Sequence, residues 1–370
     1  MSKLNPKNER IKHKYLAYLE EAKRLSVKSA DIAAAAIADF EKSTNHKDFA
    51  AFHIEQARKY KRDLSNAINS KTRKPLAKAT ICARLLAIKA FFFWLAGQSG
   101  YKSRISYSDC DYFNPSANDS HIATAKRQRP VPSLEQVRHT ISQMPYETDI
   151  EKRNRALVAC TLLTGARANA LASLKISNVD LQKRYVYQDA RTVNTKFRKT
   201  TKTTFFPVGD EIGEIVADWI DHLTSKLLFN GDDPLFPSTL IRPDQNGGFA
   251  AMGLQRTHWK STGPIRDIFK LAFEAADLPY FHPHSLRHTL SQLGERICRT
   301  PEELNAWGQN LSHENVLTLF TSYGKVSENR QAELIKKISP NNQGCENSEL
   351  TPELVNRVLI HLQEQAITNG

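Results

Sequence analysis

Side chains that could act on a phosphodiester occur in three short segments of the C-terminal half. In chain order these segments carry Arg167, then His284 and Arg287, then His313 and Tyr323. Arginine pairs bidentately with phosphate oxygens and stays charged at any working pH, so it can stabilise negative charge that develops on phosphorus. A tyrosine phenol can act as a covalent nucleophile, while histidine or lysine transfers protons. The set therefore indicates phosphoryl transfer at a phosphodiester.

A metal site is the alternative use of the histidines. His282, His284 and His288 are close in sequence, and imidazole is a common metal ligand. No cysteine lies near them and no His-Glu-x-x-His pattern is present, so we expect no metal. The cysteines are odd in number and scattered, which argues against a disulfide framework and is typical of a reducing cytosol. They are Cys82, Cys110, Cys160, Cys298 and Cys345.

The chain is strongly basic. It has 52 Lys and Arg against 39 Asp and Glu among 370 residues, a net charge of +13. Such an excess favours a polyanionic partner, with nucleic acid the first candidate. Like charges close together repel unless an anion offsets them, so we expect two basic groups to contact DNA phosphates; a solvated helix face is the alternative. The groups are Lys71, Arg73, Lys74, Lys78 and Arg84, and then Lys126, Arg127 and Arg129.

The N-terminal part is predicted to be helical. Apolar residues recur at three- and four-residue steps over residues 11–25, 29–40, 49–68 and 81–95. Thr80 is the expected cap of the last of these helices and Gly97 its end. Residues 114–116 and 118–120 have turn composition, which indicates a linker between domains. The longest apolar run, residues 85–96, contains Lys89, and the N-terminus is polar, so we expect neither a membrane span nor a secretory signal.

The second half has a mixed pattern. Ser133 and Gln136 form an expected capping box, and helices are predicted over residues 155–163, 212–228, 265–276, 286–297 and 301–307. Residues 185–187 and 204–208 have strand composition with a lysine-rich connection between them. A separate amphipathic helix is predicted over residues 352–363. We therefore expect a mostly α fold with a small β-sheet, divided into residues 1–125, 126–340 and 341–370.

The three chemical segments together resemble the signature boxes of the tyrosine recombinase (phage integrase) family. They are Thr164-Gly165-Ala166-Arg167, His284-Ser285-Leu286-Arg287-His288-Thr289, and Leu311-Ser312-His313 followed by Tyr323. The resemblance covers roughly residues 12–330. It implies a helical core-binding domain, which binds DNA, followed by a mixed α/β catalytic domain.

The resemblance also implies a role for each residue. Arg167 and Arg287 would clamp the scissile phosphate, and His284 would transfer the proton of the nucleophile. His313 would support the transition state, and Tyr323 would attack to leave a 3′-phosphotyrosyl link and a free 5′-hydroxyl. The family needs neither metal nor nucleotide for this step.

The family's catalytic lysine, which protonates the leaving 5′-oxygen, has two candidates here. Counting eight residues back from Pro207 selects Lys199. The local Thr-Lys-x-x-Lys sequence, with the lysine ending the first strand of a longer hairpin, selects Lys196, which we slightly favour. Lys202 ranks third.

Three positions depart from the family pattern. Ala170 occupies a position that is often acidic in the family, and Ser312 replaces the glycine of the usual Leu-Gly-His. Ten residues rather than nine separate His313 from Tyr323. The arginines, histidines and tyrosine of the set are nevertheless all present.

The leading hypothesis is a cytoplasmic site-specific recombinase acting on double-stranded DNA. Exchange of four strands would require a homotetramer on synapsed DNA, assembled from free monomers and served by accessory DNA-bending proteins. The helix over residues 352–363 would either dock on a neighbouring subunit or pack on its own domain. The alternatives are a type IB topoisomerase-like DNA relaxase and a basic DNA-binding protein without catalysis.

Overall fold

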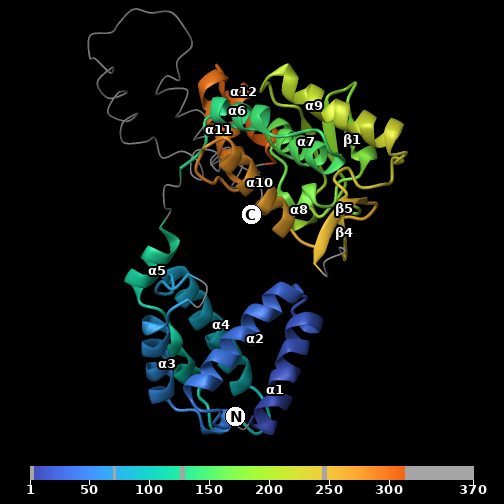
Figure 1. Ribbon diagram of the computed structural model, residues 1–370. Helices are drawn as coiled ribbons and strands as arrows, with labels where there is room; N and C mark the ends of the chain where they lie inside the picture. Colours follow the sequence, from blue (N-terminus) through green and yellow to red (C-terminus); the bar gives the residue numbers. More distant parts are fainter. Residues whose placement is uncertain (1–3, 70–71, 126–129, 244–247, 313–370) are drawn as a thin grey trace, which may run out of the picture. The chain divides into compact units, whose positions relative to one another are not determined.

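The computed structural model describes residues 4–69, 72–125, 130–243 and 248–312. Contacts divide the chain into two compact units, with the described residues up to 125 in the first and those from 130 in the second (Figure 1). Several predicted features lie outside the described residues: Lys71, Lys126, Arg127, Arg129, His313, Tyr323 and the helix over residues 352–363.

The first unit is helical, as predicted. A π turn, Tyr18–Ala22, extends its first helix, and 3₁₀ turns lie at Phe49–Ala51 and Tyr107–Phe113. Its helices are α1 (Pro6–Ala17), α2 (Val27–Ser43), α3 (Ile54–Asn66), α4 (Lys78–Ala96) and α5 (Ala117–Thr124). Local signals explain the starts of α1 and α2, because Asn5 and Ser26 accept hydrogen bonds from the first-turn backbone N–H groups.

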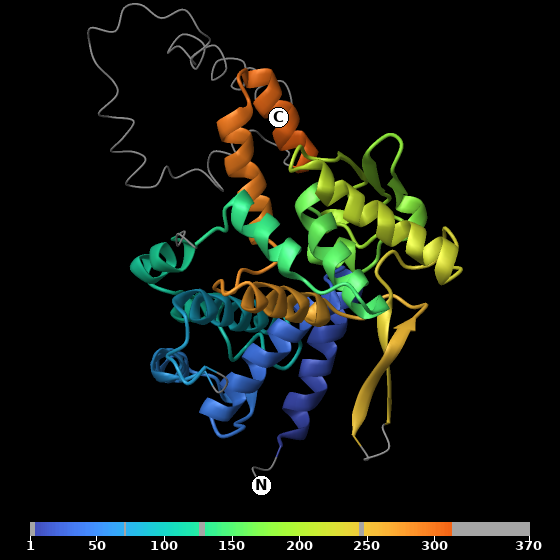
Figure 2. The same cartoon turned by 45° about the horizontal axis from the view of Figure 1, so that its top comes forward.

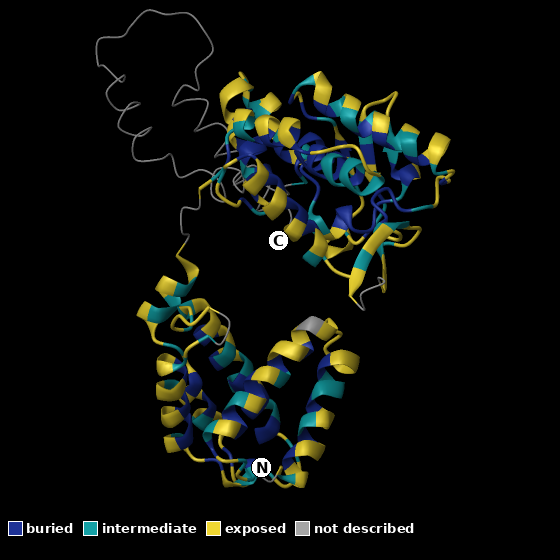
Figure 3. Cartoon of the chain, in the orientation of Figure 1, coloured by how far each residue is buried: buried dark blue, intermediate teal, exposed yellow. Residues whose placement is uncertain are grey.

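Helix α4 forms the centre of this unit's core. Ile88, Phe91, Phe92 and Leu95 are fully buried and pack among aromatic rings from the neighbouring helices. By length and composition α4 could cross a membrane, but this buried face identifies it as the core helix of a folded unit. Figure 3 shows the same pattern, with buried residues on the facing sides of the helices.

Two local predictions for the first unit are wrong. Helix α4 begins at Lys78 after Ala77, so Thr80 lies inside the helix rather than capping it, although Gly97 does end it. Residues 118–120 belong to α5, whose cap is Ser116. The Ser116 hydroxyl accepts a hydrogen bond from the Asp119 backbone N–H at 3.0 Å, so polar residues that suggested a turn instead start a helix.

The second unit surrounds the buried helix α7 (Asp149–Thr164). Every residue from Ala156 to Thr164 is buried, and α7 packs against α6, α9 and α11. Figure 2 shows the helices of this unit from a second side. The remaining helices are α6 (Leu134–Gln143), α8 (Ala168–Leu171), α9 (Asp210–Asp221) with the π turn His222–Lys226, α10 (Gly263–Ala275), α11 (Ser285–Ile297) and α12 (Pro301–Asn310).

The described residues of the second unit form two small antiparallel sheets. Strands β1 (Val179–Asp180), β2 (Tyr185–Gln188) and β3 (Thr201–Thr204) form one sheet, in that order. Strands β4 (Ser238–Pro243) and β5 (Phe249–Gln255) form a separate hairpin. The predicted fold class, mostly α with a small β component, is therefore confirmed.

The strand predicted over residues 204–208 is misplaced. β3 ends at Thr204, where that prediction begins. Phe206 instead leaves the sheet, is buried, and donates its backbone N–H to the Leu163 carbonyl near the end of α7, at 2.8 Å. Its apolar side chain belongs to the helical core, which explains why composition alone suggested a strand.

Candidate active site

The turn after α7 presents Arg167. Gly165 ends the helix in the left-handed region at φ 61°, and a Cβ on it would lie 2.9 Å from Leu311 Cδ2. Only glycine suits both the conformation and this close approach. The buried Thr164 hydroxyl accepts the Ala166 N–H at 3.2 Å and donates to the Cys160 carbonyl at 2.6 Å. The turn is thus fixed on both sides of the glycine, and Arg167 follows in extended, half-buried backbone.

Arg287 joins the three sequence segments. It lies in the first turn of α11 and is 3% exposed. Its Nη1 donates to the Gly165 carbonyl in the first segment, and its Nη2 donates to the Leu311 carbonyl in the third. One guanidinium therefore fixes the arginine turn and the chain leading to residue 313, and these bonds hold its own plane in place.

His284 lies at the start of α11, one turn before Arg287. Its ring is 5.3 Å from that of His288 in an edge-to-face arrangement and 6.2 Å from that of His282 in a parallel one. The residue as a whole is exposed, yet partial loss of water around its ring and the positive charge of Arg287 lower the pKa of His284 to about 4; His288, His282 and Arg167 act in the same direction. At neutral pH the imidazole is uncharged and can accept a proton.

Both lysine candidates lie in the connection between β2 and β3. Lys196 begins the 3₁₀ turn Lys196–Arg198, with its Nζ 4.6 Å from the centre of the Phe197 ring, and Lys199 follows that turn. Both side chains are exposed. The idea that Lys196 ends the first strand is wrong, because β2 ends at Gln188. Lys202 lies within β3, with its Nζ 4.1 Å from the Tyr185 ring centre.

Asn310, which no sequence motif marks, connects this sheet to the end of α12. Its Oδ1 accepts the Thr204 N–H and its Nδ2 donates to the Thr204 carbonyl, both at 2.8 Å. The side chain thus adds a backbone-like rung to the edge of β3. Because Asn310 is followed by Leu311, this rung also positions the segment that Arg287 binds. The only signal in the sequence was an asparagine near a helix end.

Two of the positions that depart from the family pattern, Ala170 and Ser312, lie among the described residues. Ala170 lies on α8 and is 2% exposed, so the family's acidic position is here part of the packed core. Ser312 adopts φ 56°, the left-handed region in which a residue with a Cβ is strained. The glycine of the usual family motif would occupy that conformation without strain.

The basic candidates of the first unit fall into two kinds. Arg73 and Lys74 are exposed in the turn before α4. Lys78, by contrast, pairs with Asp119, and Arg84 pairs with Asp39, each at 2.7 Å. Carboxylates of the same unit therefore already offset the charges of Lys78 and Arg84, and DNA contact by these two residues stays a prediction.

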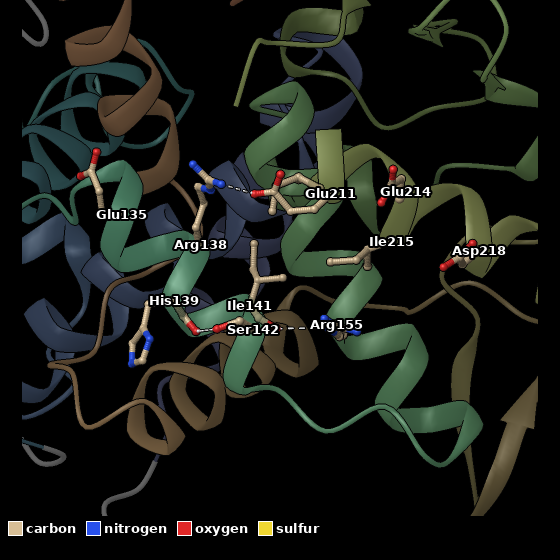
Figure 4. Close-up of a pocket in the computed structure, with 11 residues that line it drawn as sticks. Glu135, Arg138, His139, Ile141, Ser142, Arg155, Glu211, Glu214, Ile215 and Asp218 are labelled. Atoms are coloured by element: carbon tan, nitrogen blue, oxygen red, sulfur yellow. Dashed lines mark hydrogen bonds and ion pairs between the residues drawn. The ribbon is translucent and has the colours of Figure 1, made fainter. Parts of the chain in front are cut away.

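A groove between α6 and α9 lies apart from the site residues (Figure 4). Arg138 and Glu211 form an ion pair across it at 2.6 Å, and Arg155 donates to the Ile141 carbonyl at 3.1 Å. None of the described site candidates lines it. Within the described ranges no group of three His, Cys, Asp or Glu side chains is placed to hold a metal ion.

Comparison with known proteins identifies the class to which this fold and site belong. The model of the phage integrase family matches residues 133–330, more than half of the chain. The chain therefore belongs to the phage integrase family and is a site-specific tyrosine recombinase.

Individual relatives have low sequence identity to this chain, but their alignments cover most of it. Tyrosine recombinase XerC of Bacillus pumilus is 22% identical over 324 residues, which cover 86% of this chain and 93% of the relative. Tyrosine recombinase XerD of Oceanobacillus iheyensis is 24% identical over 267 residues, covering 71% of this chain and 76% of the relative.

Solved structures show the same fold. A lambda integrase(75-356) dimer bound to a COC' core site matches with a TM-score of 0.58 and 11% identity, covering 93% of this chain and 99% of that chain. The Tn1549 transposon integrase in complex with transposon right end DNA matches with a TM-score of 0.56 and 13% identity, covering 89% and 99%.

Proposed function

We propose that this recombinase cleaves and rejoins double-stranded DNA through a 3′-phosphotyrosyl intermediate on Tyr323. One observation carries the proposal: the Arg287 guanidinium bonds the carbonyls of Gly165 and Leu311. Segments more than 100 residues apart thereby meet beside Arg167 and His284. A charge fixed in this way needs no reorganisation when negative charge develops on a phosphate.

The proposed reaction follows from these residues. The Tyr323 oxygen attacks the phosphorus held by Arg167 and Arg287, a P–O bond to tyrosine forms, and the P–O5′ bond breaks. The phenolic proton passes to the neutral ring of His284, and the departing 5′-oxygen takes a proton from Lys196 or Lys199. His313 supports the phosphate. Attack by the 5′-hydroxyl of another strand reverses these steps, so the bond energy is retained without a nucleotide.

The assembly and partners belong to the same proposal. Residues 1–125 would bind duplex DNA, residues 126–340 would carry out catalysis, and residues 341–370 would dock on a neighbouring subunit. Exchange of four strands would use a homotetramer formed from monomers in the cytoplasm, with accessory proteins bending the DNA. The exposed Arg73 and Lys74 support DNA contact by the first unit. The similarity to integrases solved on DNA supports the partner.

Cleavage of a duplex that carries a nick near the cleavage site tests the proposal. The sequence of the cleavage site can be recovered by covalent capture of bound duplexes from a randomised library. Because of the nick, cleavage releases a short fragment that diffuses away, so the strand cannot be rejoined. We expect a protein–DNA complex that survives denaturant and a released strand ending in a 5′-hydroxyl. We also expect joining to a second duplex and little relaxation of a supercoiled plasmid by the monomer. Efficient relaxation without strand exchange would favour the topoisomerase-like alternative, and absence of any covalent complex would favour simple binding.

A further inference from the structure

The connection between β2 and β3, residues 189–200, is anchored to the second unit; we call it the lysine loop. Val193 is fully buried in the core of the unit. The next residue, Asn194, donates its backbone N–H to the hydroxyl of Ser173 at 2.8 Å. Lys196 follows two residues later. The loop is therefore fixed by one apolar and one polar contact just before its first candidate lysine.

Ser173 also belongs to the segment that begins at Arg167. Helix α8 starts directly after that arginine, and the Leu171 N–H donates to the Arg167 carbonyl at 3.0 Å. The Ser173 N–H donates to the Ala170 carbonyl at 2.9 Å, and its hydroxyl lies 3.1 Å from the carbonyls of Asn169 and Ala170. The side chain is 6% exposed, so water does not replace these bonds readily.

We infer that Ser173 is a positioning residue that sets the lysine loop relative to the arginine turn. A hydroxyl can donate to α8 and accept from Asn194 at once, and this dual use makes a rigid link. The inference rests on the proposed function, because it assigns the lysine in this loop the protonation of the 5′-oxygen. Without the hydroxyl the Asn194 N–H loses its acceptor and the lysine loop can shift. A displacement of about 1 Å in a reacting group can reduce the rate by roughly 10²-fold.

A change of leaving group separates this role from a general loss of structure. When sulfur replaces the bridging 5′-oxygen at the scissile phosphate, the departing thiolate needs no proton, so a misplaced acid no longer matters. The experiment compares single-turnover cleavage of the oxygen and sulfur forms of the nicked duplex by full-length variants. Ser173→Ala is the test. Thr140→Val is the matched control, because it removes a buried hydroxyl that bonds only the carbonyl of Gln136 among the described contacts.

We expect Ser173→Ala to cleave the oxygen substrate roughly 10- to 100-fold more slowly than wild type and the sulfur substrate at nearly the wild-type rate. Thr140→Val should change the cleavage rates of the oxygen and sulfur substrates by the same factor. Faster amide exchange over the lysine loop in Ser173→Ala would support the same conclusion. An equal slowing on both substrates, or no slowing at all, would overturn the inference.

Lysine variants distinguish this failure from failure of the proposed function. Lys196→Ala and Lys199→Ala are measured on the same pair of substrates. Sulfur rescue of one lysine variant but not of Ser173→Ala would reject the role of Ser173 and keep the proposed acid. If sulfur rescues neither lysine variant, no acid in this loop remains to be positioned, and both the role of Ser173 and the assignment of the acid to this loop are rejected, whereas the Tyr323 adduct tests the cleavage reaction separately.

Discussion

At the scale of single residues, the two arginines have different surroundings, so their substitution should have different effects. Arg287 is buried and bonds two backbone carbonyls, whereas Arg167 is half-buried at the end of a turn. A buried acceptor that loses its donor costs about 1–3 kcal/mol. Charge at the phosphate and stability of the fold therefore depend together on Arg287, and the less buried Arg167 should contribute less to stability.

We predict that Arg167→Ala and Arg287→Ala both reduce the cleavage rate by about 10²–10³-fold while duplex binding changes much less. Arg287→Ala should also lower the free energy of unfolding by about 2–4 kcal/mol, more than Arg167→Ala does. Single-turnover cleavage, gel-shift affinity and urea unfolding measure the three quantities. Nearly normal cleavage by either variant would contradict the clamp.

A second prediction at this scale concerns pH. The folded pKa of His284, about 4, lies below the ordinary value of 6.5. The stability that comes with the neutral ring is therefore complete above pH 6.5 and is lost as the pH falls toward 4. The value of kcat/KM for cleavage, measured with the substrate well below KM, reports free-enzyme groups and should stay constant down to about pH 5 and then fall. If the rate falls to half near pH 6.5, or if His284→Gln shows the same decrease in rate at low pH as wild type, another group controls the rate.

At the scale of secondary-structure elements, periodicity predicted most helices because most of them bury one face, and α7, which is buried all round from Ala156 to Thr164, was predicted from its apolar run. The errors arose where tertiary contacts decide. Phe206 is apolar because it packs into the helical core, and residues 118–120 are polar because they form a partly exposed first turn after the Ser116 cap. The β4–β5 hairpin went unpredicted because its strand faces are largely exposed and give no clear alternation of buried and exposed residues.

The end of α12 offers a backbone test. Ser312 is in the left-handed region, so Ser312→Gly should stabilise the second unit by about 1 kcal/mol without reducing cleavage. Ser312→Ala keeps the Cβ and should change stability by less than about 0.5 kcal/mol. Urea unfolding of the full chain gives both values. Destabilisation by glycine would mean that φ 56° is not the conformation in solution.

The joint between α1 and α2 gives a prediction for the first unit. Glu41 is 1% exposed and accepts hydrogen bonds from Lys12 at 2.5 Å and Asn8 at 3.0 Å. Glu41→Ala should cost about 1–3 kcal/mol, because the buried Asn8 amide loses an acceptor and Lys12 keeps only the more exposed carboxylate of Glu9, at 2.7 Å. The control is Glu55→Ala, whose exposed pair with Arg58 should contribute under about 0.5 kcal/mol. Similar thermal stability of the two variants would count against the buried network.

At the scale of the whole molecule, short motifs predicted which residues would act, because arginine, histidine and tyrosine chemistry at a phosphate depends on residue type. The contacts that bring these residues together in the folded chain were not predictable. The bonds from Arg287 to two carbonyls and the Asn310 rung involve backbone groups, which every residue carries and no pattern marks. The choice between Lys196 and Lys199 stayed open for a related reason, since both occupy one loop.

The central claim is that DNA becomes covalently attached to Tyr323. The most direct measurement is mass spectrometry of the peptide that retains a nucleotide after the trapped complex is digested with protease and nuclease. We predict that the phosphate is on Tyr323 and that Tyr323→Phe forms no adduct while it still binds the duplex. An adduct that maps to another residue, or that persists unchanged in Tyr323→Phe, would contradict the account.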